Sequence, residues 1–161
     1  MIGAALKKID WKNLSYDDFT GFVAVTAFLL FVLYFGWLWH ATYDYRIQMR
    51  DQMVGMYQHL PEPLPIVSED YGVHQRWLVF YIDGVKILNK PQPENVINEY
   101  RKALEKEGWA AEREYVRNDK NKTYGINMRK GEFVFSVSAR ENRDSINIHL
   151  IKRDWIYHMG L

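Results

Sequence analysis

The chain has 161 residues, a formal net charge of +1 at pH 7 and no cysteine. A cysteine-free sequence excludes disulfides, thiolate catalysis and cysteine metal sites, and a nearly neutral charge provides no basic field for nucleic acid. One long apolar segment near the N-terminus leaves enough residues after it for a single small domain.

Residues 1–20 form a short leader of mixed character. Ile2, Leu6 and Ile9 suit the apolar face of an amphipathic helix lying on a membrane surface, and a disordered leader is the equal alternative. Towards the end of the leader, Ser15 and Asp17 supply an N-cap and an acidic first turn for the helix that follows.

Residues 21–41 predict a transmembrane helix of the signal-anchor type, retained in the lipid bilayer. The run Gly21–Trp39 contains no charged residue and would cover about 28 Å as a helix, close to the hydrocarbon thickness of a membrane. Aromatic residues crowd both of its ends, as they do at membrane–water boundaries. A core helix of a soluble domain would show a polar stripe, and a cleaved signal peptide would have a shorter apolar run.

The lysines and arginines beside this segment predict its orientation. Lys7, Lys8 and Lys12 precede it, whereas Arg46 and Arg50 follow it at a comparable distance. Because positive residues are retained on the cytoplasmic side, this small bias predicts a cytoplasmic N-terminus and an extracytoplasmic C-terminal domain, periplasmic in a bacterium.

Residues 42–60 predict a juxtamembrane helix that continues after the span. Met49, Met53, Met56 and Leu60 recur at spacings of four, three and four, which places them on one side of a helix. These four residues, the methionine stripe, are our candidates for contact with a partner, either a second copy or a subunit of a membrane complex. The alternative is that the stripe packs on the chain's own domain.

Residues 61–75 predict a proline-rich linker. The segment Leu60–Pro65 reads LPEPLP, which favours an extended, semi-rigid spacer over a helix or a central strand. A ligand for a proline-binding domain is the alternative to a spacer. The residues that follow, Ile66–Val73, are interpreted as an irregular lead-in to the domain.

Residues 76–161 predict a small domain that begins with a strand. That strand is expected at Arg76–Ile82, because this run is almost entirely aromatic or branched and apolar. The Asp83-Gly84 pair is a turn signal, and Val85–Leu88 would add a short extension after it.

The rest of this domain combines one helix with a meander of strands. The helix is expected at Pro93–Glu107, because proline suits its first position and Gly108 suits a left-handed C-cap. Alternating apolar residues then predict strands at Ala110–Val116, Thr123–Arg129, Glu132–Ala139 and Ser145–Lys152. The predicted fold class is therefore α+β: a transmembrane helix, a juxtamembrane helix, and an antiparallel sheet covered by one helix.

No motif for catalysis, cofactor binding or metal binding stands out. The histidines show no pair four residues apart, and the GxGxxG, P-loop and GxSxG patterns are absent. Asp83 is interpreted as a turn residue, while Ser136 and Ser138 suit the solvated side of a strand. His40, at the end of the span, would ligate haem only against a second copy. We therefore predict no catalytic residue, no cofactor and no metal.

The sequence favours a single-pass, membrane-anchored, non-catalytic protein. Its extracytoplasmic domain would mediate protein–protein contacts as an accessory or assembly subunit of a membrane complex, with no nucleic acid as a partner. The alternative is a membrane-tethered sensing or ligand-binding module with a pocket lined by Trp77, Tyr81 and Trp109. A membrane-tethered enzyme is the third hypothesis.

Overall fold

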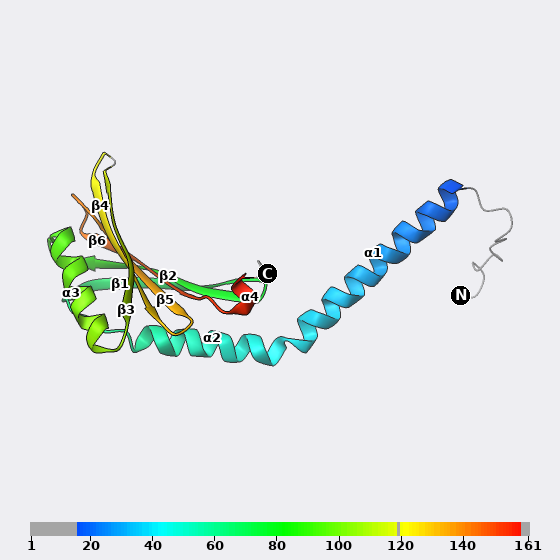
Figure 1. Cartoon of the computed structure of the whole chain (residues 1–161), viewed down its shortest axis with the longest axis horizontal. Helices are drawn as coiled ribbons and strands as arrows, with labels where there is room; N and C mark the ends of the chain where they lie inside the picture. The colour runs from blue at the N-terminus through cyan, green and yellow to red at the C-terminus, as the bar shows by residue number, and fades with distance from the viewer. Residues whose placement is uncertain (1–15, 119, 159–161) are drawn as a thin grey trace. The chain divides into compact units, whose positions relative to one another are not determined.

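The structure is a computed structural model that describes residues 16–118 and 120–158 (Figure 1). It divides into two compact units, Met1–Asp44 and Tyr45–Leu161. The expectations for residues 1–15, including the amphipathic leader and the Ser15 cap, lie outside the described residues.

The first unit contains one long helix, α1, at Tyr16–Ala41. Its sequence has no proline and no internal charged residue beyond its first turn, so nothing interrupts the helical hydrogen bonds. Thr42 follows the helix, and both its backbone N–H and its hydroxyl donate to the carbonyl oxygen of Leu38, at 3.0 and 2.8 Å. The predicted span is thus helical over its whole length.

The second unit is built on a six-stranded sheet in which every neighbouring pair is antiparallel. Its strand order is β1-β2-β6-β5-β4-β3, so β1 and β3 are the edges. The strands are β1 (Ile66–Arg76), β2 (Val79–Leu88), β3 (Ala110–Asn118), β4 (Lys122–Lys130), β5 (Phe133–Arg140) and β6 (Ser145–Lys152). A short helix, α4 (Trp155–His158), follows the last strand.

Two helices cover the same side of this sheet (Figure 1). Helix α2 (Tyr43–Gln58) contributes Met49, Met53 and Tyr57 to the core, and helix α3 (Pro93–Lys106) contributes Tyr100 and Leu104 among others. Alternate residues of the strands complete this core. We call this side the covered face and the opposite side of the sheet the outer face.

Helix α3 forms where its sequence pattern indicates. Pro93 occupies its first turn, and its buried residues recur at the three- and four-residue spacing of one helical face. Gly108, just beyond its C-terminus, has a φ of +82°, the left-handed conformation that glycine adopts without steric cost. The helix expected at Pro93–Glu107 is therefore confirmed.

The start of the sheet differs from the prediction. Residues expected to be an irregular lead-in form strand β1, and Trp77, expected inside the first strand, lies in the β1–β2 turn with a φ of +56°. The expected turn at Asp83-Gly84 is wrong, because β2 continues through it. Gly84 serves close packing there, since a Cβ at this position would lie 2.8 Å from the hydroxyl oxygen of Tyr57.

The sheet is covered by two helices, whereas the sequence predicted one. Helix α2 was expected as a separate juxtamembrane element, but it belongs to the compact unit Tyr45–Leu161. Met49, Met53 and Tyr57 of α2 pack into the same core as the buried residues of α3. The coarser prediction, an α+β domain with an antiparallel sheet after one long apolar helix, is confirmed.

We expect a fragment comprising Tyr45–Leu161 to unfold in one cooperative transition, monitored by circular dichroism during heating. A fragment that starts at Pro65 lacks α2 and loses Met49, Met53 and Tyr57 from the core. Losing a single large buried side chain costs about 2–5 kcal/mol, against a total stability of about 5–15 kcal/mol for a typical domain. The shorter fragment should therefore melt at a much lower temperature or without cooperativity. Equal melting temperatures would show that α2 adds nothing to the core.

Candidate functional site

The surface of α1 is the first candidate. The segment Phe19–Ala41 is 23 residues long, carries no buried residue in its most apolar window and is long and apolar enough to cross a membrane. Large apolar side chains such as Phe28, Leu30 and Leu33 are exposed. A core helix of a soluble domain would bury such side chains within the chain, so the exposure is compatible with a membrane anchor.

The methionine stripe, predicted as a partner contact, lies mostly against the chain's own domain. Met49 and Met53 are buried in the core, with only 6% and 0% of their surface exposed. Met56 and Leu60 are partly buried and pack against the same core. Helix α2 also buries Arg46 and Tyr57, which the stripe did not include. Contact between a partner and the stripe stays a prediction, and it depends on the exposed parts of Met56 and Leu60.

A buried charge links α2, the proline-rich segment and the sheet. Lys86, on the covered face of β2, is 4% exposed, and its Nζ lies 3.0 Å from Glu62 Oε1 and 3.2 Å from Glu69 Oε1. The hydroxyl of Tyr57 donates to the same Glu69 oxygen at 2.5 Å. Burial, followed by this hydrogen bond, raises the pKa of Tyr57 well above its usual value.

Tyr100 of α3 lies close enough to Glu62 and Glu69 for their charges to affect the pKa of its hydroxyl. Its hydroxyl is buried and has no hydrogen-bond partner among the described residues. Burial raises the pKa of Tyr100 above its usual value, and the charges of Glu62 and Glu69 raise it further. The group Lys86, Glu62, Glu69 and Tyr57 is thus a structural cluster that fastens the proline-rich segment to the domain.

The outer face carries a row of polar residues that the sequence did not reveal. Asp83 on β2 faces His149 on β6, and His149 faces Ser136 on β5. Nδ1 of His149 lies 2.7 Å from Asp83 Oδ1, while Tyr81 packs beside both His74 and His149, at ring-centroid distances of 5.2 and 5.7 Å.

These residue types occur in catalytic triads, but their geometry here is that of a surface row. Within the described part of the chain, no hydrogen bond joins the Ser136 hydroxyl to His149. No hollow described below includes Ser136 in its lining, so nothing places a reacting atom beside this hydroxyl. The Asp83–His149 pair therefore orients an imidazole on an exposed surface.

A shallow hollow of about 530 Å³ lies beside this row, at the β1, β2 and β6 side of the sheet. Gly72 lacks a side chain on the outer face at this place, so the sheet backbone forms part of the hollow. Two carboxylates and an imidazole give it a polar character. Its lining residues are Asp70, Tyr71, Gly72, His74, Asp83, Gly84, Val85, Asn147 and Ile148.

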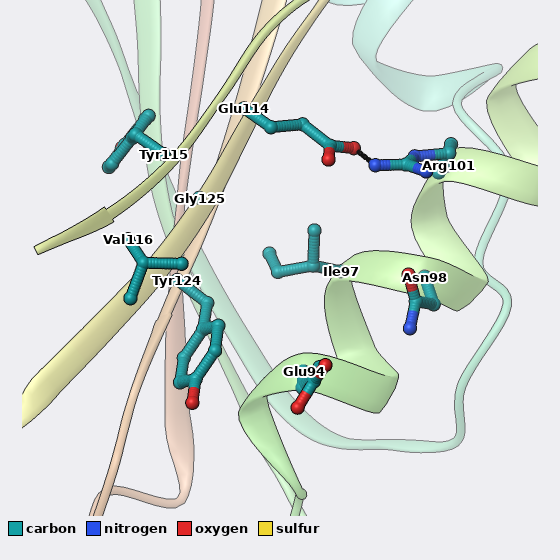
Figure 2. Close-up of a pocket in the computed structure, with 9 residues that line it drawn as sticks. All are labelled: Glu94, Ile97, Asn98, Arg101, Glu114, Tyr115, Val116, Tyr124 and Gly125. Atoms are coloured by element: carbon teal, nitrogen blue, oxygen red, sulfur yellow. Dashed lines mark ion pairs between the residues drawn. The ribbon is translucent and has the colours of Figure 1, made fainter.

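A second hollow, of about 270 Å³, lies between α3 and the edge strand β3 (Figure 2). Ile97, Val116 and Tyr124 present apolar surface to it, and an ion pair between Arg101 and Glu114 closes one side. Most small-molecule pockets have volumes of about 300–1,000 Å³. At about 270 Å³, this hollow is slightly smaller than that range. A third hollow, of about 400 Å³, lies between the proline-rich segment and the N-terminus of α3.

The three aromatic residues predicted to line one ligand pocket do not converge. Trp109 is buried in the core of the covered face, where its ring contacts Phe135. Tyr81 lies on the outer face, and Trp77 is in the exposed β1–β2 turn. Among the described residues, no three histidine or acidic side chains lie close enough together to hold a metal ion.

Comparisons of the chain with protein-family models, with curated proteins and with solved structures find no match.

We expect Glu69→Gln to destabilise the unit Tyr45–Leu161 by about 1–3 kcal/mol, measured by urea unfolding at pH 7. The substitution leaves the buried ammonium of Lys86 with one carboxylate, and it weakens the acceptor of the Tyr57 hydroxyl. Glu62→Gln is the matched control, because the Glu62 side chain is 54% exposed and its contribution should be below about 1 kcal/mol. An equal loss in both variants would contradict the assignment of Glu69 as the principal partner.

Proposed function

We propose that this chain is a non-catalytic, single-pass membrane protein. Its α+β domain would lie outside the cytoplasm and contact other proteins as an accessory or assembly subunit of a membrane complex. The observation that carries the proposal is helix α1, whose segment Phe19–Ala41 exposes apolar side chains over a length that matches a bilayer. Water would disfavour such a surface, and hydrocarbon would accommodate it.

The short connection after the span supports a role close to the membrane. The candidate span ends at Ala41, and the compact domain begins at Tyr45. A connection of this length reaches about 10–14 Å even when fully extended. The domain is then confined to the layer beside the membrane surface, where the proteins within reach are other membrane proteins.

The surfaces of the domain support protein contact over chemistry. The hollow in Figure 2 lies beside edge strand β3 and is lined by both apolar and charged side chains. An edge strand presents unpaired backbone N–H and C=O groups, which a partner segment can use. Side-chain hollows beside backbone edges are a usual arrangement for peptide and protein recognition.

A membrane-tethered binding module is the second candidate function, and one observation favours it. The outer-face hollow of about 530 Å³ falls within the size range of small-molecule sites, and Asp70 and Asp83 would favour a small cationic ligand. Differential scanning fluorimetry against a panel of small amines would test this candidate. A rise in melting temperature that Asp83→Asn abolishes would favour it over protein contact.

We expect the full chain to remain in the membrane fraction after washing with alkaline carbonate and to require detergent for release. A reporter that is active only outside the cytoplasm, fused to Leu161, should give signal in a bacterial host. Replacing the three leader lysines by glutamine should reduce that signal, because these residues retain the N-terminus inside. The leader lysines are Lys7, Lys8 and Lys12.

The matched control replaces three lysines of the domain by glutamine, at Lys102, Lys106 and Lys120. Their charges lie far from the span in sequence, so the reporter signal should not change. Recovery of the chain in the soluble fraction would contradict the proposed membrane anchor. An inactive reporter on a membrane-bound chain would show that the C-terminal domain lies in the cytoplasm.

We expect single cysteines at Met56 or Leu60 to cross-link to a neighbouring protein in native membranes, because both side chains keep part of their surface exposed. The chain has no cysteine of its own, so each cross-link reports one position. Gln52→Cys, on an exposed part of α2 outside the stripe, is the control and should cross-link less. Equal cross-linking at Gln52 would contradict the prediction that the methionine stripe is a contact surface.

A further inference from the structure

The two edges of the sheet offer regular stretches of different length to a partner strand. Edge strand β3 has an irregular register between Ala111 and Arg113, and its acidic residues are engaged within the chain. Glu112 lies 3.5 Å from both Arg129 and Arg153, and Glu114 pairs with Arg101. The irregular register shortens the stretch of β3 that another strand can pair with.

Edge strand β1 also carries charges, among them Glu69 beside Lys86, but its regular register is longer than that of β3. Its pairing with β2 is irregular only between Ile66 and Ser68, and the register then runs without interruption from Ser68 to Arg76. The regular stretch contains no proline and no lysine, and most of it is exposed. It therefore presents a long row of backbone donors and acceptors that no other described strand uses.

The acidic and basic residues of β1 are placed so that two copies of the strand, running antiparallel, have complementary charges. On the outer face, Asp70 lies before Gly72, whereas His74 and Arg76 lie after it. Within the described part of the chain, neither Asp70 nor Arg76 forms a salt bridge. Two such strands running antiparallel bring the acidic half of one opposite the basic half of the other, whereas two parallel strands would bring like charges together.

We propose that β1 is the contact surface for a second copy of this chain, joined antiparallel about Gly72. This inference rests on the proposed contact function and names its partner. Gly72 is the midpoint of the regular stretch, so this register uses all of it and forms a symmetric, isologous interface. It pairs Asp70 with His74 of the second copy and Ser68 with Arg76 of the second copy.

The register also keeps the two faces of the sheet continuous. Side chains alternate between faces with a period of two, so opposing residues must belong to the same face in both copies. Pairing about Gly72 meets this condition and joins two six-stranded sheets into one. A register centred on Val73 would meet it as well, but it would leave Ser68 and Glu69 without partner residues in β1.

Gly72, at the midpoint of the proposed pairing, leaves space for the side chain of His74. A Cβ on Gly72 would lie 2.9 Å from Nε2 of His74, so the imidazole ring extends across the glycine. At the two-fold axis the glycines of the two copies face each other. Their lack of side chains leaves room on the outer face for both imidazole rings beside the Asp70 carboxylates.

The test uses two differently tagged full-length chains, one with Ser68→Cys and one with Arg76→Cys, expressed together in the same membrane and oxidised there. Opposing residues in an antiparallel pair have Cα atoms about 4.5–5.5 Å apart, within the range of a disulfide. The mixed pair should therefore cross-link efficiently. Either variant alone should not, because identical positions would lie about 27 Å apart along the strands.

The matched control places cysteines on the other edge, at Arg113 and Arg117 of β3, and should give no cross-link. A second pair of variants tests the charges in detergent by light scattering. Asp70→Lys should weaken association about ten-fold, because each substitution acts twice about the two-fold axis. Adding His74→Asp should restore association, because it places a carboxylate opposite each introduced lysine.

Absence of the mixed Ser68–Arg76 cross-link in the membrane would overturn the proposal, and so would equal cross-linking of the β3 control. Efficient cross-linking by Ser68→Cys alone would overturn the antiparallel register about Gly72. Because membrane retention and reporter activity are measured separately, a negative cross-linking result would leave the proposed anchor function standing. A chain that is found in the soluble fraction and still cross-links would contradict the proposed anchor and support the proposed β1 interface.

Discussion

Burial of one face of the sheet is the constraint on which the rest of this structure depends. Helices α2 and α3 both pack on that face, and together they exclude water from a core that includes Met53, Leu104 and Ile126. The hydrophobic free energy of this burial is the main driving force for the domain. The outer face and the two edges are left with the polar, aromatic and backbone groups available for contacts.

The buried ammonium of Lys86 couples three segments to this core. It joins Glu62 of the proline-rich segment and Glu69 of β1, while Tyr57 of α2 donates to the same Glu69. A charge buried without its partners would cost several kcal/mol, so the three segments must keep their positions together. This interdependence explains why LPEPLP, which resembles a spacer, is part of the domain.

The proposed anchor and the proposed β1 interface reinforce each other physically. Confinement beside a membrane raises the local concentration of the domain, so a weak edge-to-edge contact can become significant. The pairing uses backbone hydrogen bonds and two symmetric contacts between Asp70 and His74, and it requires no large apolar patch on the domain. The proposed interface would therefore form when helix α1 holds two copies of the domain beside the same bilayer.

The sequence by itself determined the features that depend on local pattern. An uncharged apolar run predicted α1, a proline start and Gly108 predicted α3, and period-two alternation predicted β6 at the residues observed. Tertiary structure alone decided the inward direction of Met49 and Met53 and the strand character of Asp83-Gly84. It also decided the meeting of Asp83 with His149, and the position of β1 at an edge. These depend on pairing between residues distant in sequence, which a local pattern does not encode.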